Sequence, residues 1–391
     1  MIYKNRITKS FSYLLIFLLV ISSFPQNPHA IEYSAKTEIS KKDGEYLVDT
    51  KISNILEDQE YVDVLIELKE QIDTRVVAEN TTHLLTSQIK KSEYDLKIRT
   101  AIVDKLETLA NKSQKEILQQ LSLFEATGEV KNVKSFYIVN MVAATVSKSA
   151  LEVLAKRKDI VSIHLDDKIE IDLPTITANI SSQPTNTDNI EWGVKQVGAP
   201  EVWEEYGVDG QGVVVGLIDT GVSWEHEALK EKWRGYDPNN PNNPNSSGNW
   251  FDAVNGNSMP YDIASIPHGS HVLGTILGQD PAGENKIGVA PGAQWIAAKA
   301  FTADGGQDSW LLAAGQFMLA PNGDPLLAPD IINNSWGGQP GRDEWYRTMV
   351  QAWRNAGILP VFSGGNKGPG SGTVAPSFEL PGKLCGCCNR F

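Results

Sequence analysis

The sequence predicts an α/β protein in which a parallel-sheet domain follows a smaller α+β domain. From Trp192 onward, apolar strand-like runs alternate with helical patterns, which is typical of a parallel sheet. Residues 61–172 follow the order strand, helix, strand, strand, helix, strand, which is that of a ferredoxin-like split βαβ domain. Residues 173–189 are rich in Thr, Ser, Asn and Pro, and we interpret them as the linker between the two domains.

The N-terminal residues 1–30 have the features of a signal peptide. Three basic residues precede an apolar run at 11–24, which is too short to span a bilayer comfortably, and Ala30 is a plausible cleavage position. We therefore expect a secreted, extracellular protein, and the alternative is an uncleaved membrane anchor. Residues 31–60 form a polar N-terminal segment with no clear periodicity.

Within residues 61–172, each element has its own pattern. Alternation predicts a strand at 61–68, and apolar residues between 82 and 123 recur at helical spacing. Two strands broken near Asn140 are expected in 130–147, followed by a capped amphipathic helix at 147–157 and a strand at 160–165.

The second domain, residues 190–376, is expected to hold four buried strands and three helices. Apolar runs predict strands at 213–218, 294–301, 330–335 and 358–363. Helical patterns fall at 268–278, 307–320 and 342–356, and an Asn- and Pro-rich surface loop at 237–248.

Charge and cysteine content limit the classes of partner. The net charge is −13, which argues against a nucleic-acid partner because phosphate binding needs a basic surface. Beyond the N-terminal run no segment is suited to crossing a membrane, so no stable membrane association is expected. The three cysteines, Cys385, Cys387 and Cys388, cannot form a disulfide framework for the body of the chain. A metal site at this cluster is an alternative, although no His or Cys partner stands at ligand spacing nearby.

An aspartate and a histidine carry the clearest chemistry. Asp219 ends an apolar strand, and ligands of open α/β sheets bind outside such carboxyl ends. An ionised Asp219 can accept a hydrogen bond from Nδ1 of a histidine, which fixes the tautomer and stabilises the imidazolium of acyl transfer. His268 begins a helical pattern, and its Nε2 would be the general base for a serine. Acid, histidine and serine, in that order, is one of the chain orders of the Ser-His-Asp triad.

Two glycine-rich segments, 333–338 and 363–368, each end a predicted strand. The side-chain amide of Asn366 lies between glycines, where it could face a developing oxyanion. Either segment alone is no more than a glycine-rich turn. The motifs at Asp219 and His268 are specific together, in that order and after a signal peptide and a pro-like domain, and these two segments strengthen the interpretation.

Residues from 192 to about 376 resemble the subtilases, the subtilisin-like serine peptidases. Asp219-Thr220-Gly221 is similar to the aspartate motif of that family, and residues 268–272 are similar to its histidine motif. The resemblance implies that Asn366 is the oxyanion donor. It also implies a substrate-binding segment, formed by Ser335, Trp336, Gly337 and Gly365.

The resemblance extends to residues 61–172, which are similar to an inhibitor-type propeptide. It implies that this propeptide is an intramolecular inhibitor and a folding aid, and that the partners of the second domain are protein and peptide substrates. No cofactor and no metal site are predicted. A structural calcium ion is conceivable, but Ala228 stands where many subtilases have an aspartate, and residues 279–286 do not match the usual calcium loop.

The nucleophilic serine of a triad should follow His268 in a Gly-Thr-Ser-Met-like segment, and none occurs in the sequence. Residues 377–391 have instead the character of an aberrant, frameshift-like tail, so 190–376 are expected to be a partial, C-terminally truncated catalytic domain. We therefore expect a serine endopeptidase precursor that is inactive as this chain. The alternative is a non-catalytic propeptide and pseudoprotease fragment that binds intact relatives.

Overall fold

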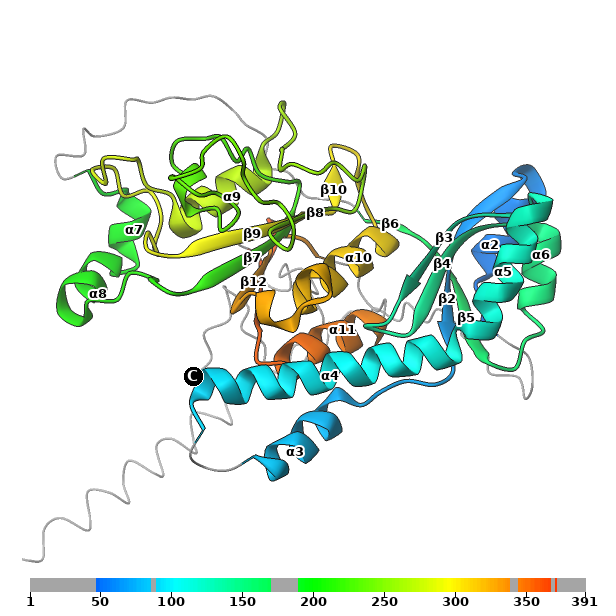
Figure 1. Cartoon of the computed structure of the whole chain (residues 1–391). Helices are drawn as coiled ribbons and strands as arrows, with labels where there is room; N and C mark the ends of the chain where they lie inside the picture. Colours follow the sequence, from blue (N-terminus) through cyan, green and yellow to red (C-terminus); the bar gives the residue numbers. More distant parts are fainter. Residues whose placement is uncertain (1–46, 86–88, 170–188, 338–343, 367–369, 371–391) are drawn as a thin grey trace, which may run out of the picture. The chain divides into compact units, whose positions relative to one another are not determined.

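The computed structural model describes residues 47–85, 89–169, 189–337, 344–366 and 370. The expected signal peptide, the linker and the aberrant tail lie outside the described residues, apart from Asn189 at the end of the linker. Residues 41–391 form one compact unit, and its described residues include two five-stranded sheets and one three-stranded sheet. Figure 1 shows the two larger sheets with helices α10 and α11 drawn between them.

The first five-stranded sheet has the strand order β1-β5-β2-β4-β3. Its central strand β2 (Tyr61–Leu68) pairs antiparallel with β4 on one side and with β5 on the other. The remaining strands are β1 (Leu47–Val48), β3 (Val130–Phe136), β4 (Met141–Ser147) and β5 (Ile160–Leu165). From β2 to β5 this is the order of elements expected for a split βαβ domain.

The domain begins earlier than the sequence suggests. Helix α2 (Thr50–Asp58) starts at Asp49, whose side chain accepts a hydrogen bond from the Lys51 amide at 2.9 Å. Ile52 and Leu56, four residues apart on one face, are buried in the core of the domain. Residues 31–60 are expected to be a polar segment without periodicity, and the structure describes a short helix, Thr50–Asp58, in its last part.

The helical stretch expected at 82–123 consists of three helices, namely α3 (Thr74–Leu84), α4 (Lys91–Ser113) and α5 (Lys115–Thr127). Gln114 separates α4 from α5, and its buried Nε2 donates to the Phe136 carbonyl at 3.0 Å and to Asn140 Oδ1 at 2.9 Å. Asn140 itself has a positive φ of 47° in the turn between β3 and β4. Helix α6 (Lys148–Leu154), capped by Ser147, completes the domain.

The second five-stranded sheet is wholly parallel and has the order β13-β12-β7-β9-β8. The four expected strands correspond to β7 (Val214–Asp219), β9 (Gln294–Lys299), β12 (Ile331–Asn334) and β13 (Leu359–Phe362). The three expected helices correspond to α9 (His268–Leu277), α10 (Asp308–Leu319) and α11 (Glu344–Asn355). Strand β8 (Trp250–Asp252) and two short helices, α7 (Trp192–Gln196) and α8 (Ala199–Tyr206), were not predicted from the sequence.

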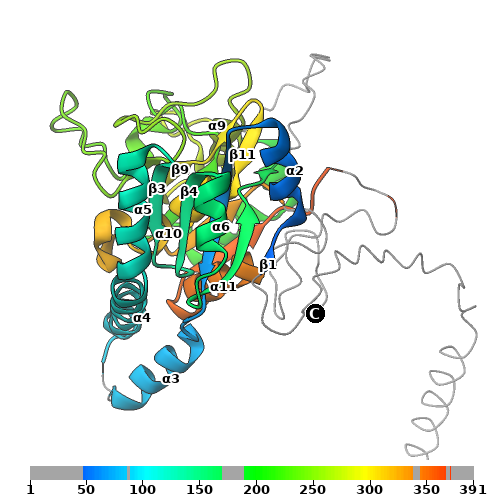
Figure 2. The same ribbon diagram turned by 90° about the vertical axis from the view of Figure 1, so that its right-hand side faces the viewer.

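Three hydrophobic clusters hold these layers together. One lies between the first sheet and helices α2, α5 and α6, which Figure 2 shows grouped together. A second lies between the parallel sheet and α9, where Leu273 and Leu277 pack with Trp233 and Trp295. The third is shared, because it joins side chains of β2, β4 and α4 with those of α10, α11 and the other face of the parallel sheet.

Polar contacts reinforce the seam between the two domains. Strand β6 (Lys168–Ile169) pairs antiparallel with β11 (Gly305–Gln307), which in turn pairs with β10 (Phe301–Thr302). The Asp166 carboxylate accepts a hydrogen bond from the Ser309 amide at 2.8 Å, at the start of α10. Gln316, near the other end of α10, accepts from the Tyr137 amide at 2.7 Å. The two domains are thus joined by hydrogen bonds near both ends of α10.

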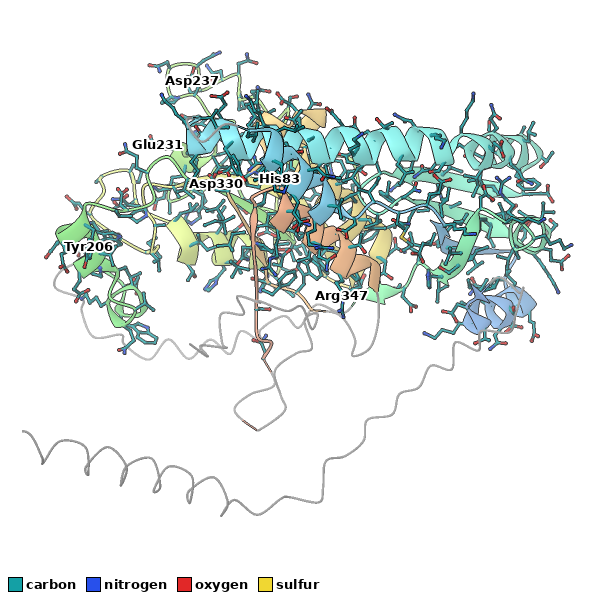
Figure 3. All side chains as sticks on the ribbon, turned by 90° about the horizontal axis from the view of Figure 1, so that it is seen from below. His83, Tyr206, Glu231, Asp237, Asp330 and Arg347 are labelled. Carbon is teal, nitrogen blue, oxygen red and sulfur yellow. The ribbon has the colours of Figure 1, made fainter. Side chains whose placement is uncertain are left out.

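Helix α4 adds a further contact on the far side of α11. Arg99 donates through Nε to the Ala356 carbonyl at 3.1 Å and through Nη1 to the Pro325 carbonyl at 3.3 Å. Figures 1 and 3 both show α4 running beside α11. No helix among the described residues is both long enough and apolar enough to span a membrane.

We predict that Arg99→Ala lowers the free energy of unfolding by about 1–3 kcal/mol, because two part-buried carbonyls lose a charged donor. Urea denaturation measures the change. Lys97→Ala on the same helix is the control, since exposed Lys97 pairs with Glu93 one turn away, at 3.0 Å. An equal loss in both variants would show that Arg99 contributes nothing specific to the seam.

Candidate active site

Asp219 and His268 meet at the carboxyl edge of the parallel sheet. Asp219 is the last residue of β7 and is buried, and His268 is the first residue of α9. Nδ1 of His268 donates to Oδ1 of Asp219 at 2.7 Å, and the same oxygen accepts from the Thr220 amide at 2.7 Å. A neutral His268 ring therefore carries its proton on Nδ1 and its lone pair on Nε2. This is the tautomer that a general base needs.

The surroundings favour the protonated form of the ring. The hydrogen bond to Asp219 raises the pKa of His268 above its usual value, burial opposes the rise, and the charges of Asp219 and Asp262 add to it. The second carboxylate oxygen of Asp219, Oδ2, is buried and accepts no hydrogen bond from the described residues. The Asp219 carboxylate is therefore compensated through Oδ1, by the His268 ring and the Thr220 amide, and by the nearby charge of Lys299.

Two glycines of the motifs allow the strand and the helix to approach each other. A Cβ at Gly269 would overlap the Gly221 carbonyl, and Gly221 itself has a φ of +116°. A Cβ at Gly221 would in turn overlap the Tyr261 carbonyl. Glycine is required at position 269 because the backbone that follows β7 lies directly against the first turn of α9. It is required at position 221 because of the positive φ and because the backbone at Tyr261 lies against it.

The sequence analysis missed two charged residues at this edge. Lys299, at the end of β9 and level with Asp219 in the sheet register, is buried and donates to the carbonyls of Thr220 and Phe301. Burial lowers the pKa of Lys299, and the charges of Asp262, Asp252 and Asp219 oppose this effect. Lys299 could have been noticed as a lysine within an apolar run.

Asp262, the second missed residue, precedes α9 by six positions. Its Oδ1 accepts a hydrogen bond from the Thr220 hydroxyl at 2.7 Å, and its Oδ2 accepts from the Ser270 hydroxyl at 2.6 Å. It therefore links the loop after β7 to the first turn of α9. A weak signal for this role is present in the sequence, because Pro267, the residue before α9, cannot cap a helix with its side chain.

The remaining predicted residues follow β12 and β13 at the same edge of the sheet. Ser335 accepts a hydrogen bond from the side-chain amide of Asn333 at 2.9 Å, and Gly337 lies two residues further along the chain. Trp336 is buried between aromatic rings, with ring centroids 5.6 to 6.3 Å away, so only its backbone is available to a ligand. Gly365 has a φ of +82°, and both it and Asn366 are exposed.

The strand order places these segments one and two strands away from Asp219, since β12 is next to β7 and β13 is next to β12. The structure thus brings Asp219 and His268 into direct contact and the other predicted residues to the same edge. Among the residues that the structure describes, no group of three or more His, Cys, Asp or Glu side chains is placed to hold a metal ion. The three cysteines lie outside that part of the chain.

Comparison with protein families matches residues 210–383 to the subtilase family, Peptidase S8. Bacillopeptidase F of Bacillus subtilis is 44% identical over 295 residues, which are 72% of this chain and 20% of that protein. A likeness to bacillopeptidase F is predicted by three segments of the sequence, namely the Asn- and Pro-rich loop and residues 249–253 and 343–347. The 44% identity confirms it.

A second relative is the minor extracellular protease Vpr of Bacillus subtilis, 26% identical over 69% of this chain and 31% of that protein. The chain thus spans about a fifth to a third of the length of these two relatives. The crystal structure of the epidermin leader peptide processing serine protease from Staphylococcus aureus has 17% sequence identity and a TM-score of 0.43, and it covers 79% of this chain and 61% of that one.

We predict that the stability contributed by the Asp219–His268 pair decreases with rising pH. The pKa of folded His268 lies above its usual 6.5, so the contribution is complete below about pH 6.5 and is lost as the pH rises through the folded value. Urea denaturation of the original chain and of His268→Gln, between about pH 5.5 and 8.5, measures it as the difference in free energy of unfolding. His83→Gln, at an exposed position of α3, is the control. A difference that stays constant or grows with pH would contradict the assignment.

Proposed function

Residues 210–383 form a domain of the subtilase family, and from this premise we propose that the chain is the precursor of a secreted serine endopeptidase. The proposed reaction is hydrolysis of peptide bonds in proteins and peptides through an acyl-enzyme. The observation that carries the proposal is the 2.7 Å hydrogen bond between buried Asp219 and His268 at the carboxyl edge of a parallel sheet. Bacillopeptidase F and the minor extracellular protease Vpr are proteases by name, which supports the same class of reaction.

In this reaction each residue has a separate role. Nε2 of His268 takes the proton of the attacking serine and later gives it to the leaving amine, while Asp219 holds the ring and stabilises its positive charge. The side-chain amide of Asn366 donates to the oxyanion of the tetrahedral intermediate. The backbone of residues 335–337 and Gly365 align the substrate. The serine segment does not occur within residues 1–391, and a polypeptide of these residues alone lacks the nucleophile.

We assign residues 61–172 the role of a propeptide that inhibits the catalytic domain and aids its folding. Support comes from the seam, where β6 pairs with β11 just before the chain enters the undescribed segment 170–188. The shared hydrophobic cluster supports a role in folding, because α10 and α11 bury part of their surface against this domain. The signal-like residues 1–30 support secretion, and so does the likeness to the minor extracellular protease Vpr.

A second candidate function is a non-catalytic fragment that binds intact relatives. The observation that favours it is the separate hydrophobic cluster of the first domain, whose buried residues run from Ile52 to Ile163. A domain with its own core can present the same surface to the catalytic domain of another molecule.

We predict that a polypeptide of residues 1–391 hydrolyses casein no faster than a buffer blank. Loss of the serine from a Ser-His-Asp site lowers turnover by about 2 × 10⁶, so residual activity falls below detection. The measurement is casein hydrolysis together with labelling by a fluorophosphonate, with an intact subtilisin as the positive control. Hydrolysis that the fluorophosphonate blocks would reveal another serine nucleophile and would overturn the prediction.

We predict that Asn366→Ala lowers turnover by about 10²–10³ in a form of the protein that also carries the serine segment, because the oxyanion loses a donor. Steady-state kinetics on a peptide substrate test this. Asn242→Ala, in the exposed loop at 237–248, is the matched control and should leave turnover unchanged. Equal turnover in the two variants would remove Asn366 from the mechanism.

A further inference from the structure

Helix α9 places His268 in its first turn, but its own N-cap residue cannot anchor that turn. The first amides of a helix have no acceptor within the helix, and a side chain of the N-cap residue usually supplies one. The N-cap of α9 is Pro267, whose side chain makes no such hydrogen bond. The acceptors must come from elsewhere in the fold.

Asp262 supplies them from outside the helix. Its Oδ2 accepts from the Ser270 amide at 2.8 Å. The Gly269 amide donates to the Thr220 hydroxyl at 2.9 Å, and that hydroxyl donates to Oδ1 of Asp262 at 2.7 Å. One carboxylate therefore satisfies one amide of the first turn directly and a second through Thr220.

The direction of each hydrogen bond in this group is fixed. An ionised carboxylate only accepts, so the hydroxyls of Thr220 and Ser270 both donate to Asp262. Their lone pairs then accept backbone amides, that of Gly269 at 2.9 Å and that of Ser223 at 2.8 Å. With the Ile263 amide at 2.8 Å, Asp262 accepts four hydrogen bonds, which tie α9 to the loop that follows Asp219.

We propose that Asp262 is a positioning residue for the Asp219–His268 pair. It holds the end of β7 and the first turn of α9 in a fixed relative position. This position sets the 2.7 Å contact between the Asp219 and His268 side chains. Its negative charge also lies at the positive end of the α9 dipole and close to the ring of His268. The inference rests on the proposed function, because this geometry matters for proton transfer at Nε2.

Other charged groups lie at the same edge of the sheet as Asp262 and also act on His268 or on one another. Asp219 faces His268 directly, and the Lys299 ammonium from β9 is near Asp219, Asp262 and Asp252. Asp252 is held by its own loop, accepting from the Val254 amide at 3.0 Å and from the Tyr261 hydroxyl at 3.1 Å. Besides Asp219, Asp262 is the carboxylate whose charge raises the pKa of His268. Removal of that charge should therefore lower the pKa of the His268 ring.

The test is Asp262→Asn in the 391-residue chain, observed by proton NMR. The amide has nearly the same shape, but its nitrogen cannot accept from the Ser270 amide or hydroxyl. We expect the pKa of His268 to fall and the Nδ1–H resonance of the Asp219–His268 hydrogen bond to weaken. His268→Gln assigns both signals.

Asp324→Asn is the matched control. Asp324 caps another short helix, accepting from the Leu326 amide at 2.9 Å, so this variant also loses one charge and one cap. The His268 signals should not change in it. If Asp262→Asn lowers only the melting temperature and leaves both His268 signals as they were, Asp262 is a helix cap without a positioning role and the proposal is wrong.

Ser270→Ala keeps the inference testable if Asp262→Asn does not fold. It leaves the charge of Asp262 in place and removes the hydroxyl that links Asp262 to the Ser223 amide. We expect a weaker Nδ1–H resonance, restored by Ser270→Thr, and an unchanged resonance in Ser270→Ala would overturn the proposal. None of these measurements involves peptide hydrolysis, so they stay separate from a failure of the proposed function.

Discussion

Helices α10 and α11 bury side chains against two sheets at once, and the other layers depend on this shared packing. Met318 of α10 and Met349 of α11 belong to the same cluster as Met141 of the first sheet and Ile218 of the parallel sheet. The two helices lie close together because Gly315 has no side chain, since a Cβ there would overlap Met349. The shared core thereby fixes one face of β7 and β12, the strands that carry the site residues to their edge.

Helices α9 and α10 are both capped at their N-termini by carboxylates from outside the helix. α9 begins after Pro267 and α10 after Gln307, and neither residue caps its helix with a side chain. Asp262 provides the missing acceptor for α9 and Asp166 for α10. The start of each helix therefore depends on tertiary packing, and for α10 that packing comes from the first domain.

The sequence was sufficient for the elements whose pattern is local. Buried parallel strands have continuous apolar runs, and the strand end at Asp219 and the helix start at His268 could both be located from them. The break at Gln114 could not be found, because its cause is hydrogen bonding to the distant turn at Asn140. Asp262 and Lys299 have weak local signals, a proline before α9 and a lysine within an apolar run, but their roles depend on partners that only folding brings close. The roles of Asn366 and of the substrate-binding segment stay predictions.

The carboxyl group of Asp166 makes the seam between the domains sensitive to acidity. Burial raises the pKa of Asp166 from 3.8 to about 6, although the hydrogen bonds from Ser309 pull the other way. Between these two values the folded chain holds a proton that the unfolded chain has released, so falling pH favours the assembled form. Above about pH 6 the seam instead encloses an ionised carboxylate. A mildly acidic medium therefore favours the folded chain, in which Asp166 meets Ser309, more than a neutral or alkaline one does.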